Sequence, residues 1–170
     1  MKIENAAFEP NNGNAVVKPY VMSHGTLEVQ NLQKSRRFYE EFLGLECVRH
    51  AKPGMVIRCG MKFHIVCIEV GNAIQPASFL THWGLDVESK AAVDEAYNYS
   101  HKLKDEYGIR RITPCVQQHG VYSFYIEDLD HNWWEFQHYD GFQHDDMFAF
   151  GDVFAADELA GTDHLGELDM

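Results

Sequence analysis

The sequence lacks any apolar stretch long enough to cross a bilayer, because its longest apolar runs are only as long as a strand. The opening residues, MKIENAAFEPNNGNAVV, lack the apolar segment of a secretory signal. The four cysteines form no CxxC pair, so we expect free thiols in a reducing compartment rather than disulfides. These absences predict a cytoplasmic protein with no membrane partner.

Positive charge is also scarce, since 14 Lys and Arg face 26 Asp and Glu and the net charge is -12. Contacts with nucleic-acid phosphates need clustered Lys and Arg, so we expect no nucleic-acid partner. Residues 140–170 contain nine acidic residues and no Lys or Arg, which leaves the first 139 residues at -3. This acidic tail also carries several phenylalanines, which could cover a pocket or contact a neighbouring subunit.

The first half of the chain shows one complete order of predicted elements. Residues 24–30 alternate like a strand, and Asn31 is a suitable cap for a helix over residues 32–44 that ends at Gly44. Three strand-like runs then follow, at residues 45–50, 55–60 and 62–70.

The second half repeats this order. Residues 82–87 resemble a strand, Ser89 is a helix cap, and an amphipathic helix is expected over residues 90–107 before Gly108. Three more strand-like runs follow, at residues 110–118, 121–127 and 132–139. With 170 residues the chain is long enough for one well-buried domain.

The repeat predicts an α+β fold made of two paired βαβββ modules. Side by side, they would form a curved, mostly antiparallel sheet with the helices outside and a cup inside, where a ligand or metal can bind. We expect one domain over residues 22–139 with an arm and a tail. The segments are an arm (1–21), module 1 (22–70), a linker (71–79), module 2 (80–139) and the acidic tail (140–170).

Three residues suggest a metal site. His24 and His82 are the first residues of the equivalent strands of the two halves, so approximate two-fold symmetry would bring their side chains toward each other. Glu135 lies between aromatic residues in the last strand, where an unpaired carboxylate is unfavourable and a metal ion would compensate its charge. Two imidazoles and one carboxylate form the facial triad of non-haem Fe(II) oxygenases, and they can also hold Mn(II) or Zn(II).

Two stretches carry a family resemblance. The segment HGTLEVQNLQKSRRFYEEFLGLE, which begins at His24, resembles the opening of a vicinal oxygen chelate module, the family of glyoxalase I, bleomycin-resistance proteins and extradiol dioxygenases. Residues 125–135 resemble the closing motif of that family, in which a D-x-D-G-N turn precedes the metal-binding Glu. His131 stands where glycine is usual. The resemblance covers residues 22–139 and implies a homodimer.

Within that family, QHGVYSFYIEDLDHNWWE is most similar to the type I extradiol ring-cleaving dioxygenases. The resemblance implies that Tyr125 and His119 contact the substrate and that His64 is near the place of the acid–base histidine. Each residue also has an ordinary structural interpretation. Tyr125 could pack over the sheet, His119 could be exposed at its turn, and His64 could be a core histidine.

The resulting hypothesis is a non-haem Fe(II) extradiol dioxygenase that opens a small, catechol-like aromatic substrate with O2. One alternative is a glyoxalase-like lyase, isomerase or thiol transferase that uses Mn(II), Zn(II) or Ni(II) as a Lewis acid, with Glu69 as a candidate fourth ligand. Another is a metal-free, drug-binding protein of the bleomycin-resistance kind, which has no reason to keep all three ligands.

Overall fold

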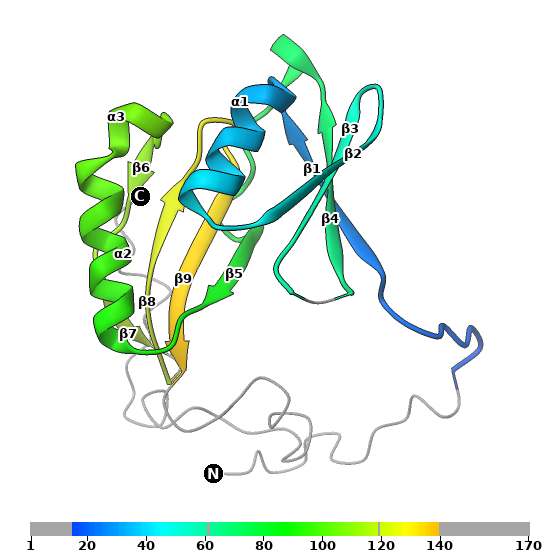
Figure 1. The fold of residues 1–170 in the computed structure, drawn as a ribbon. Helices are drawn as coiled ribbons and strands as arrows, with labels where there is room; N and C mark the ends of the chain where they lie inside the picture. Colours follow the sequence, from blue (N-terminus) through cyan, green and yellow to red (C-terminus); the bar gives the residue numbers. More distant parts are fainter. Residues whose placement is uncertain (1–14, 61, 119, 140–170) are drawn as a thin grey trace.

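The computed structural model describes residues 15–60, 62–118 and 120–139 (Figure 1). The predictions that concern most of the arm, His119 and the acidic tail lie outside these described residues. No helix among them is long and apolar enough to span a membrane.

Module 1 forms a four-stranded sheet in the order β1-β4-β3-β2. Strands β1 and β4 are parallel, and the other neighbours are antiparallel. The elements are β1 (His24–Val29), α1 (Leu32–Arg37), the π-helical turn η2 (Phe38–Phe42), β2 (Glu46–Ala51), β3 (Gly54–Arg58) and β4 (His64–Glu69), followed by the short 3-10 helix η3 (Gly71–Ala73).

The first helix begins and ends where its sequence signals lie. The Asn31 side chain accepts a hydrogen bond from the backbone N–H of Lys34 at 3.0 Å, and Glu69 accepts one from the backbone N–H of Leu32 at 2.7 Å. Two of the first free N–H groups of the helix are thereby satisfied. Gly44 ends the helical segment with a φ of 70°, which is accessible to glycine at little cost.

Module 2 repeats the arrangement as a five-stranded sheet in the order β5-β9-β8-β6, with β7 also paired to β8. Strands β5 and β9 are parallel, as β1 and β4 are. The elements are β5 (His82–Asp86), α2 (Lys90–Lys102), α3 (Lys104–Tyr107), β6 (Arg111–Ile112), β7 (Val116–Gln118), β8 (Val121–Glu127) and β9 (Trp133–Tyr139).

The paired-module prediction is confirmed, with three local differences. The structure has two separate open sheets rather than one curved sheet. The helix expected over residues 90–107 is interrupted at Leu103. The strand expected over residues 110–118 is divided around Pro114, which has no N–H for a sheet hydrogen bond.

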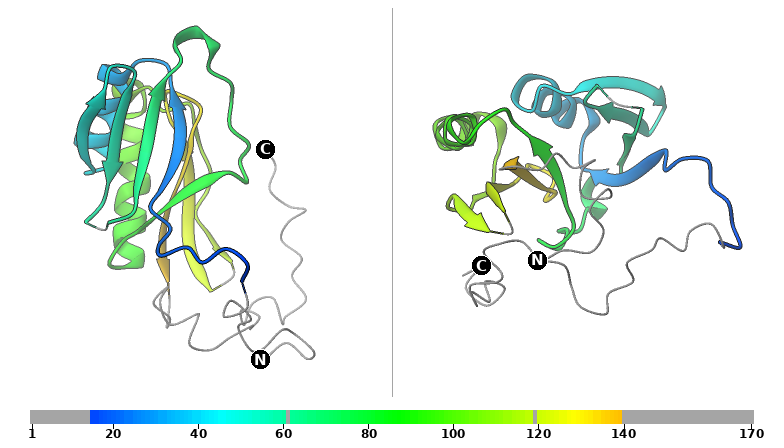
Figure 2. Two further views of the ribbon diagram at one scale, coloured as in Figure 1. Left: turned by 90° about the vertical axis from the view of Figure 1, so that its right-hand side faces the viewer. Right: turned by 90° about the horizontal axis from the view of Figure 1, so that it is seen from below.

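The two sheets meet at their edge strands β1 and β5, which both views of Figure 2 place next to each other. A Cβ added at Gly25 would overlap Cη2 of Trp83, so only glycine allows this approach. One hydrophobic core continues across both modules, and the ring of Tyr39 in module 1 lies 5.6 Å from that of Trp134 in module 2.

The turn between β8 and β9, residues 128–132, also joins the modules, and we call it the inter-module clasp. Asp130 accepts hydrogen bonds from the backbone N–H of Gln30 at 2.7 Å and from the Ser35 hydroxyl at 2.5 Å. The Asn132 side chain donates to the carbonyl of Glu28 at 2.9 Å. The turn that precedes β9 is therefore fixed to β1 and α1 of the other module.

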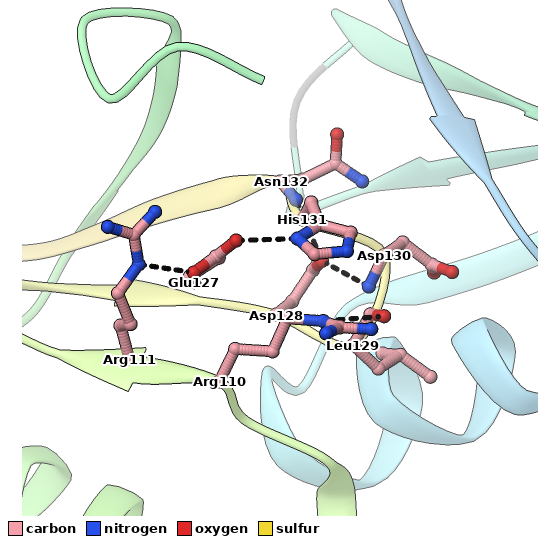
Figure 3. A network of polar contacts seen from close by, with 8 residues as sticks. All are labelled: Arg110, Arg111, Glu127, Asp128, Leu129, Asp130, His131 and Asn132. Atoms are coloured by element: carbon pink, nitrogen blue, oxygen red, sulfur yellow. Dashed lines mark hydrogen bonds and ion pairs between the residues drawn. The ribbon is translucent and has the colours of Figure 1, made fainter. Parts of the chain in front are cut away.

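Asp128 holds the clasp turn in shape (Figure 3). One carboxylate oxygen accepts from the backbone N–H groups of Asp130 and Asn132, and the other accepts from the indole of Trp134 at 2.9 Å and the hydroxyl of Tyr39 at 3.4 Å. Burial, followed by the neighbouring charge of Asp130, raises the pKa of Asp128 to about 7.

His131 occupies the clasp position where the family motif usually has glycine. Its φ is 65°, and it is the one non-glycine with a positive φ among the described residues. Its Nδ1–H donates to Glu127 at 2.7 Å, and Arg111 donates to the other oxygen of the same carboxylate (Figure 3). These contacts hold His131 in a backbone conformation that residues other than glycine rarely adopt.

Replacing Asp128 with Asn should lower the free energy of unfolding by about 1–3 kcal/mol, because an amide cannot accept hydrogen bonds through both of its ends. The raised pKa means that the folded state keeps the Asp128 proton between pH 3.8 and about 7, while the unfolded chain loses it. The contribution of Asp128 to wild-type stability therefore declines as pH rises through this window. The difference in the free energy of unfolding between the wild type and the variant narrows accordingly. Urea unfolding at several pH values measures both effects, with the exposed Asp105→Asn as control. A gap that stays constant between pH 4 and pH 7 would contradict this account.

Candidate metal centre

The site begins with a contact between the first residue of β5 and the middle of β9. Nε2 of His82 lies 3.3 Å from Oε2 of Glu135. Nδ1 of His82 lies 3.1 Å from the carbonyl oxygen of Phe79, which can only accept, so Nδ1 carries a hydrogen. In a neutral imidazole, Nε2 would then be an acceptor facing a second acceptor. A proton or a metal cation between the two atoms removes this conflict.

The electrostatics of the pair agree with that geometry. The hydrogen bond to Glu135 raises the pKa of His82. Burial raises the pKa of Glu135, but the nearby donors His82, Ser123 and Tyr125 outweigh it, so the net pKa is lowered. Glu135 is therefore a carboxylate that stays ionised although it is only 8% exposed.

Aromatic side chains surround the pair. Tyr125 is the register partner of Glu135 on β8, and its ring lies 5.0 Å from that of His82. Burial, followed by the charge of Glu135, raises the pKa of Tyr125, so its hydroxyl stays a donor at neutral pH. Phe79 packs edge-on against Tyr125 at 4.7 Å and against Trp133 at 5.0 Å. Trp133 and Trp134 are both buried.

His24 lies in a second pair, on the other sheet. It is the register partner of His64, and the two rings are stacked with their centroids 5.7 Å apart. Among residues 15–60, 62–118 and 120–139, no three His, Cys, Asp or Glu side chains lie close enough together to hold a metal. The structure therefore brings His82 to Glu135 and His24 to His64, and it does not join the two pairs.

The donor set still fits a divalent cation. Two facing acceptor atoms on His82 and Glu135 supply half of a tetrahedral site, and both ligand types bind divalent first-row metals. His24 begins the strand adjacent to the one that begins with His82, because β1 and β5 pack together at Gly25 and Trp83. His24 remains the predicted third ligand.

Glu69, the candidate fourth ligand, has a different role. It lies at the opposite end of β4 from His64 and accepts a hydrogen bond from the first turn of α1. Glu69 lies five residue steps along the strand from His64, which corresponds to about 16 Å. Glu69 is exposed at the end of β4, so the structure does not place it among the candidate ligands.

One residue of the site was not predicted from the sequence. Phe79 acts through its backbone carbonyl, which leaves no signal in the sequence. Ser123 is fully buried on the same face of β8 as Tyr125, where strand alternation predicts it.

The chain belongs to the Glyoxalase/Bleomycin resistance protein/Dioxygenase superfamily, whose family model matches residues 21–136. This assignment agrees with the two modules of the fold.

Solved structures with this fold include lactoylglutathione lyase from Agrobacterium tumefaciens, at 23% identity and a TM-score of 0.54, with 73% of this chain and 98% of that chain covered. The fosfomycin resistance protein FosX from Listeria monocytogenes is similar at 23% identity, with a TM-score of 0.55 and coverage of 71% and 94%. A glyoxalase/bleomycin resistance protein/dioxygenase from Nocardioides has 15% identity, a TM-score of 0.58 and coverage of 78% and 93%. At these identities the likeness concerns the fold alone. No curated protein sequence matches the chain.

The His82–Glu135 contact predicts a measurable titration in metal-free protein. NMR of the imidazole Cε1–H should give His82 a pKa above its ordinary 6.5, and Glu135→Gln should lower that pKa because the carboxylate is its largest cause. The raised pKa means that the pair stabilises the fold below pH 6.5 and that this contribution is lost as pH rises through the folded-state value.

The matched control is Glu69→Gln, which removes a carboxylate of the other module that bonds α1. His82→Ala assigns the resonance. An unchanged His82 titration in Glu135→Gln would show that the two side chains do not interact in solution.

Proposed function

We propose that this protein is a non-haem Fe(II)-dependent extradiol dioxygenase in which His24, His82 and Glu135 hold the metal ion. The proposal is carried by one observation, the approach of Nε2 of His82 to Oε2 of Glu135 with Nδ1 committed to a backbone carbonyl. This arrangement directs two acceptor lone pairs at one point, which is the geometry that a cation requires.

The number of ligands favours an open coordination sphere. Glu135 pairs with the residue two positions after His82. The equivalent position in module 1 is the partner of Thr26, and it is occupied by Val66. Module 1 therefore has no counterpart of the Glu135 carboxylate. A three-ligand site leaves positions for substrate and O2, as in the facial triad of oxygenases.

The surrounding residues suit a catechol-like substrate. Fe(II) bound at this site would bring the two substrate oxygens and O2 together and supply the electron transfer that ring cleavage needs. The Tyr125 hydroxyl, which stays protonated, would donate a hydrogen bond to a substrate hydroxylate. His64, stacked on His24, would take a proton from a substrate hydroxyl and return it to the product. His119, which lies outside the described residues, is proposed to orient the same oxygen.

The second candidate is a glyoxalase-like lyase, isomerase or thiol transferase with Mn(II), Zn(II) or Ni(II) as a Lewis acid. It is favoured by the solved structures with this fold, which include a lactoylglutathione lyase and a fosfomycin resistance protein. The absence of a carboxylate at Val66 and the distant position of Glu69 favour the dioxygenase. A metal-free drug-binding protein would not need the buried, ionised Glu135.

Single Ala variants of His24, His82 and Glu135 should each lose tightly bound metal, measured by elemental analysis of protein purified without added metal. Full occupancy in any variant would remove that residue from the site.

We further propose a homodimer, to be tested by light scattering. If His24 binds beside Glu135 of a second copy, mixing unfolded His24→Ala and Glu135→Ala chains before refolding should restore part of the metal. If all ligands come from one chain, the mixture should stay empty.

Anaerobically Fe(II)-loaded protein should consume O2 and form a yellow ring-opened product from at least one member of a catechol panel. Tyr125→Phe should reduce turnover by about two to three orders of magnitude, because one donor to the developing charge is lost. Tyr97→Phe, on α2, is the control and should keep full activity. Turnover of a glutathione hemithioacetal, without O2 uptake on any catechol, would replace the dioxygenase proposal with the lyase.

A further inference from the structure

Ser123 is the one buried side-chain polar group among the described residues that has no hydrogen-bond partner. It has no exposed surface. The other two fully buried serines both satisfy their hydroxyls. Ser35 donates to the Asp130 carboxylate at 2.5 Å, and Ser100 donates to the carbonyl of Ala96 at 2.8 Å. A buried hydroxyl without a partner is unfavourable and calls for a specific explanation.

The position of Ser123 places it beside the candidate metal centre. Strand alternation puts Ser123 on the same face of β8 as Tyr125, which is paired with Glu135. Its own register partner is Gln137, two residues after Glu135 on β9. The hydroxyl lowers the pKa of both Glu135 and Tyr125, so it lies near both groups, although no hydrogen bond of normal geometry joins them.

We propose that Ser123 is a positioning residue for Glu135, and that its hydroxyl donates a hydrogen bond to the Glu135 carboxylate when a divalent cation binds. This inference rests on the metal site proposed above. A cation that replaces the proton between Nε2 of His82 and Oε2 of Glu135 would bond to both atoms and reorient the carboxylate. The Ser123 hydroxyl can rotate to follow it, because it has no other bond to break.

The burial of Ser123 argues for this role over direct binding of substrate. A side chain with no exposed surface can be reached only by groups that already lie in the interior, and the Glu135 carboxylate is such a group. Hydrogen bonds to a ligating carboxylate fix its orientation, and their removal typically weakens metal binding by about 10- to 100-fold.

Two serine variants separate a positioning role from a structural one. Mn(II) binding to metal-free protein is followed by the EPR signal of free Mn(II), and the Tm of the metal-free protein is measured alongside. Ser123→Ala should keep the Tm of the wild type, because it loses no hydrogen bond, and should bind Mn(II) about 10- to 100-fold more weakly. Ser100→Ala, the matched control, should show the opposite pattern of a lowered Tm and unchanged Mn(II) affinity.

Ser123→Thr restores the hydroxyl and should recover most of the Mn(II) affinity. If the added methyl group prevents folding, Ser123→Cys, which keeps a weaker donor at similar volume, should give an intermediate affinity. Unchanged Mn(II) affinity in Ser123→Ala, whatever its Tm, would overturn the proposal for Ser123 and leave the metal site intact. Wild-type protein that binds no Mn(II), Fe(II) or Zn(II) would overturn both.

Discussion

The chemistry proposed for this chain depends on the contact between the imidazole of His82 and the carboxylate of Glu135. The Phe79 carbonyl fixes the hydrogen of His82 on Nδ1, and the buried carboxylate stays ionised. These two facts leave two electron pairs facing each other at 3.3 Å. Such an arrangement is stable only with positive charge between the atoms, which a proton supplies in metal-free protein and a divalent cation can supply in the loaded protein.

The rest of the fold positions this contact relative to the first module. The clasp turn immediately precedes β9, and its buried carboxylates bind the backbone and side chains around β1 and α1. Because Gly25 has no side chain, the indole of Trp83 on β5 can pack directly against β1. The strand that begins with His24 and the strand that carries Glu135 are thus held by the same few polar contacts, so a change in the clasp is also a change in the geometry of the site.

Local signals in the sequence predicted the modules well, because each depends on near neighbours in the chain. The glycine at the end of the first helix and the histidine that begins β5 lie where the spacing indicated. The break at Leu103 was not predicted, and neither was the bond from His82 to the Phe79 carbonyl, because a backbone oxygen three residues before His82 is present whatever residue stands there. Sequence reasoning grouped His24 with His82 through symmetry, whereas the single chain pairs His24 with His64. Symmetry indicates equivalent places in two modules, and it does not fix the distance between them.

The central claim is that His82 and Glu135 share one divalent cation, and anomalous diffraction from crystals soaked in Co(II) or Fe(II) tests it most directly. The account predicts one strong peak about 2.0–2.2 Å from Nε2 of His82 and from an oxygen of Glu135, with an imidazole of His24 completing the set. A peak at other side chains, or no peak between His82 and Glu135 at saturating metal, would contradict it.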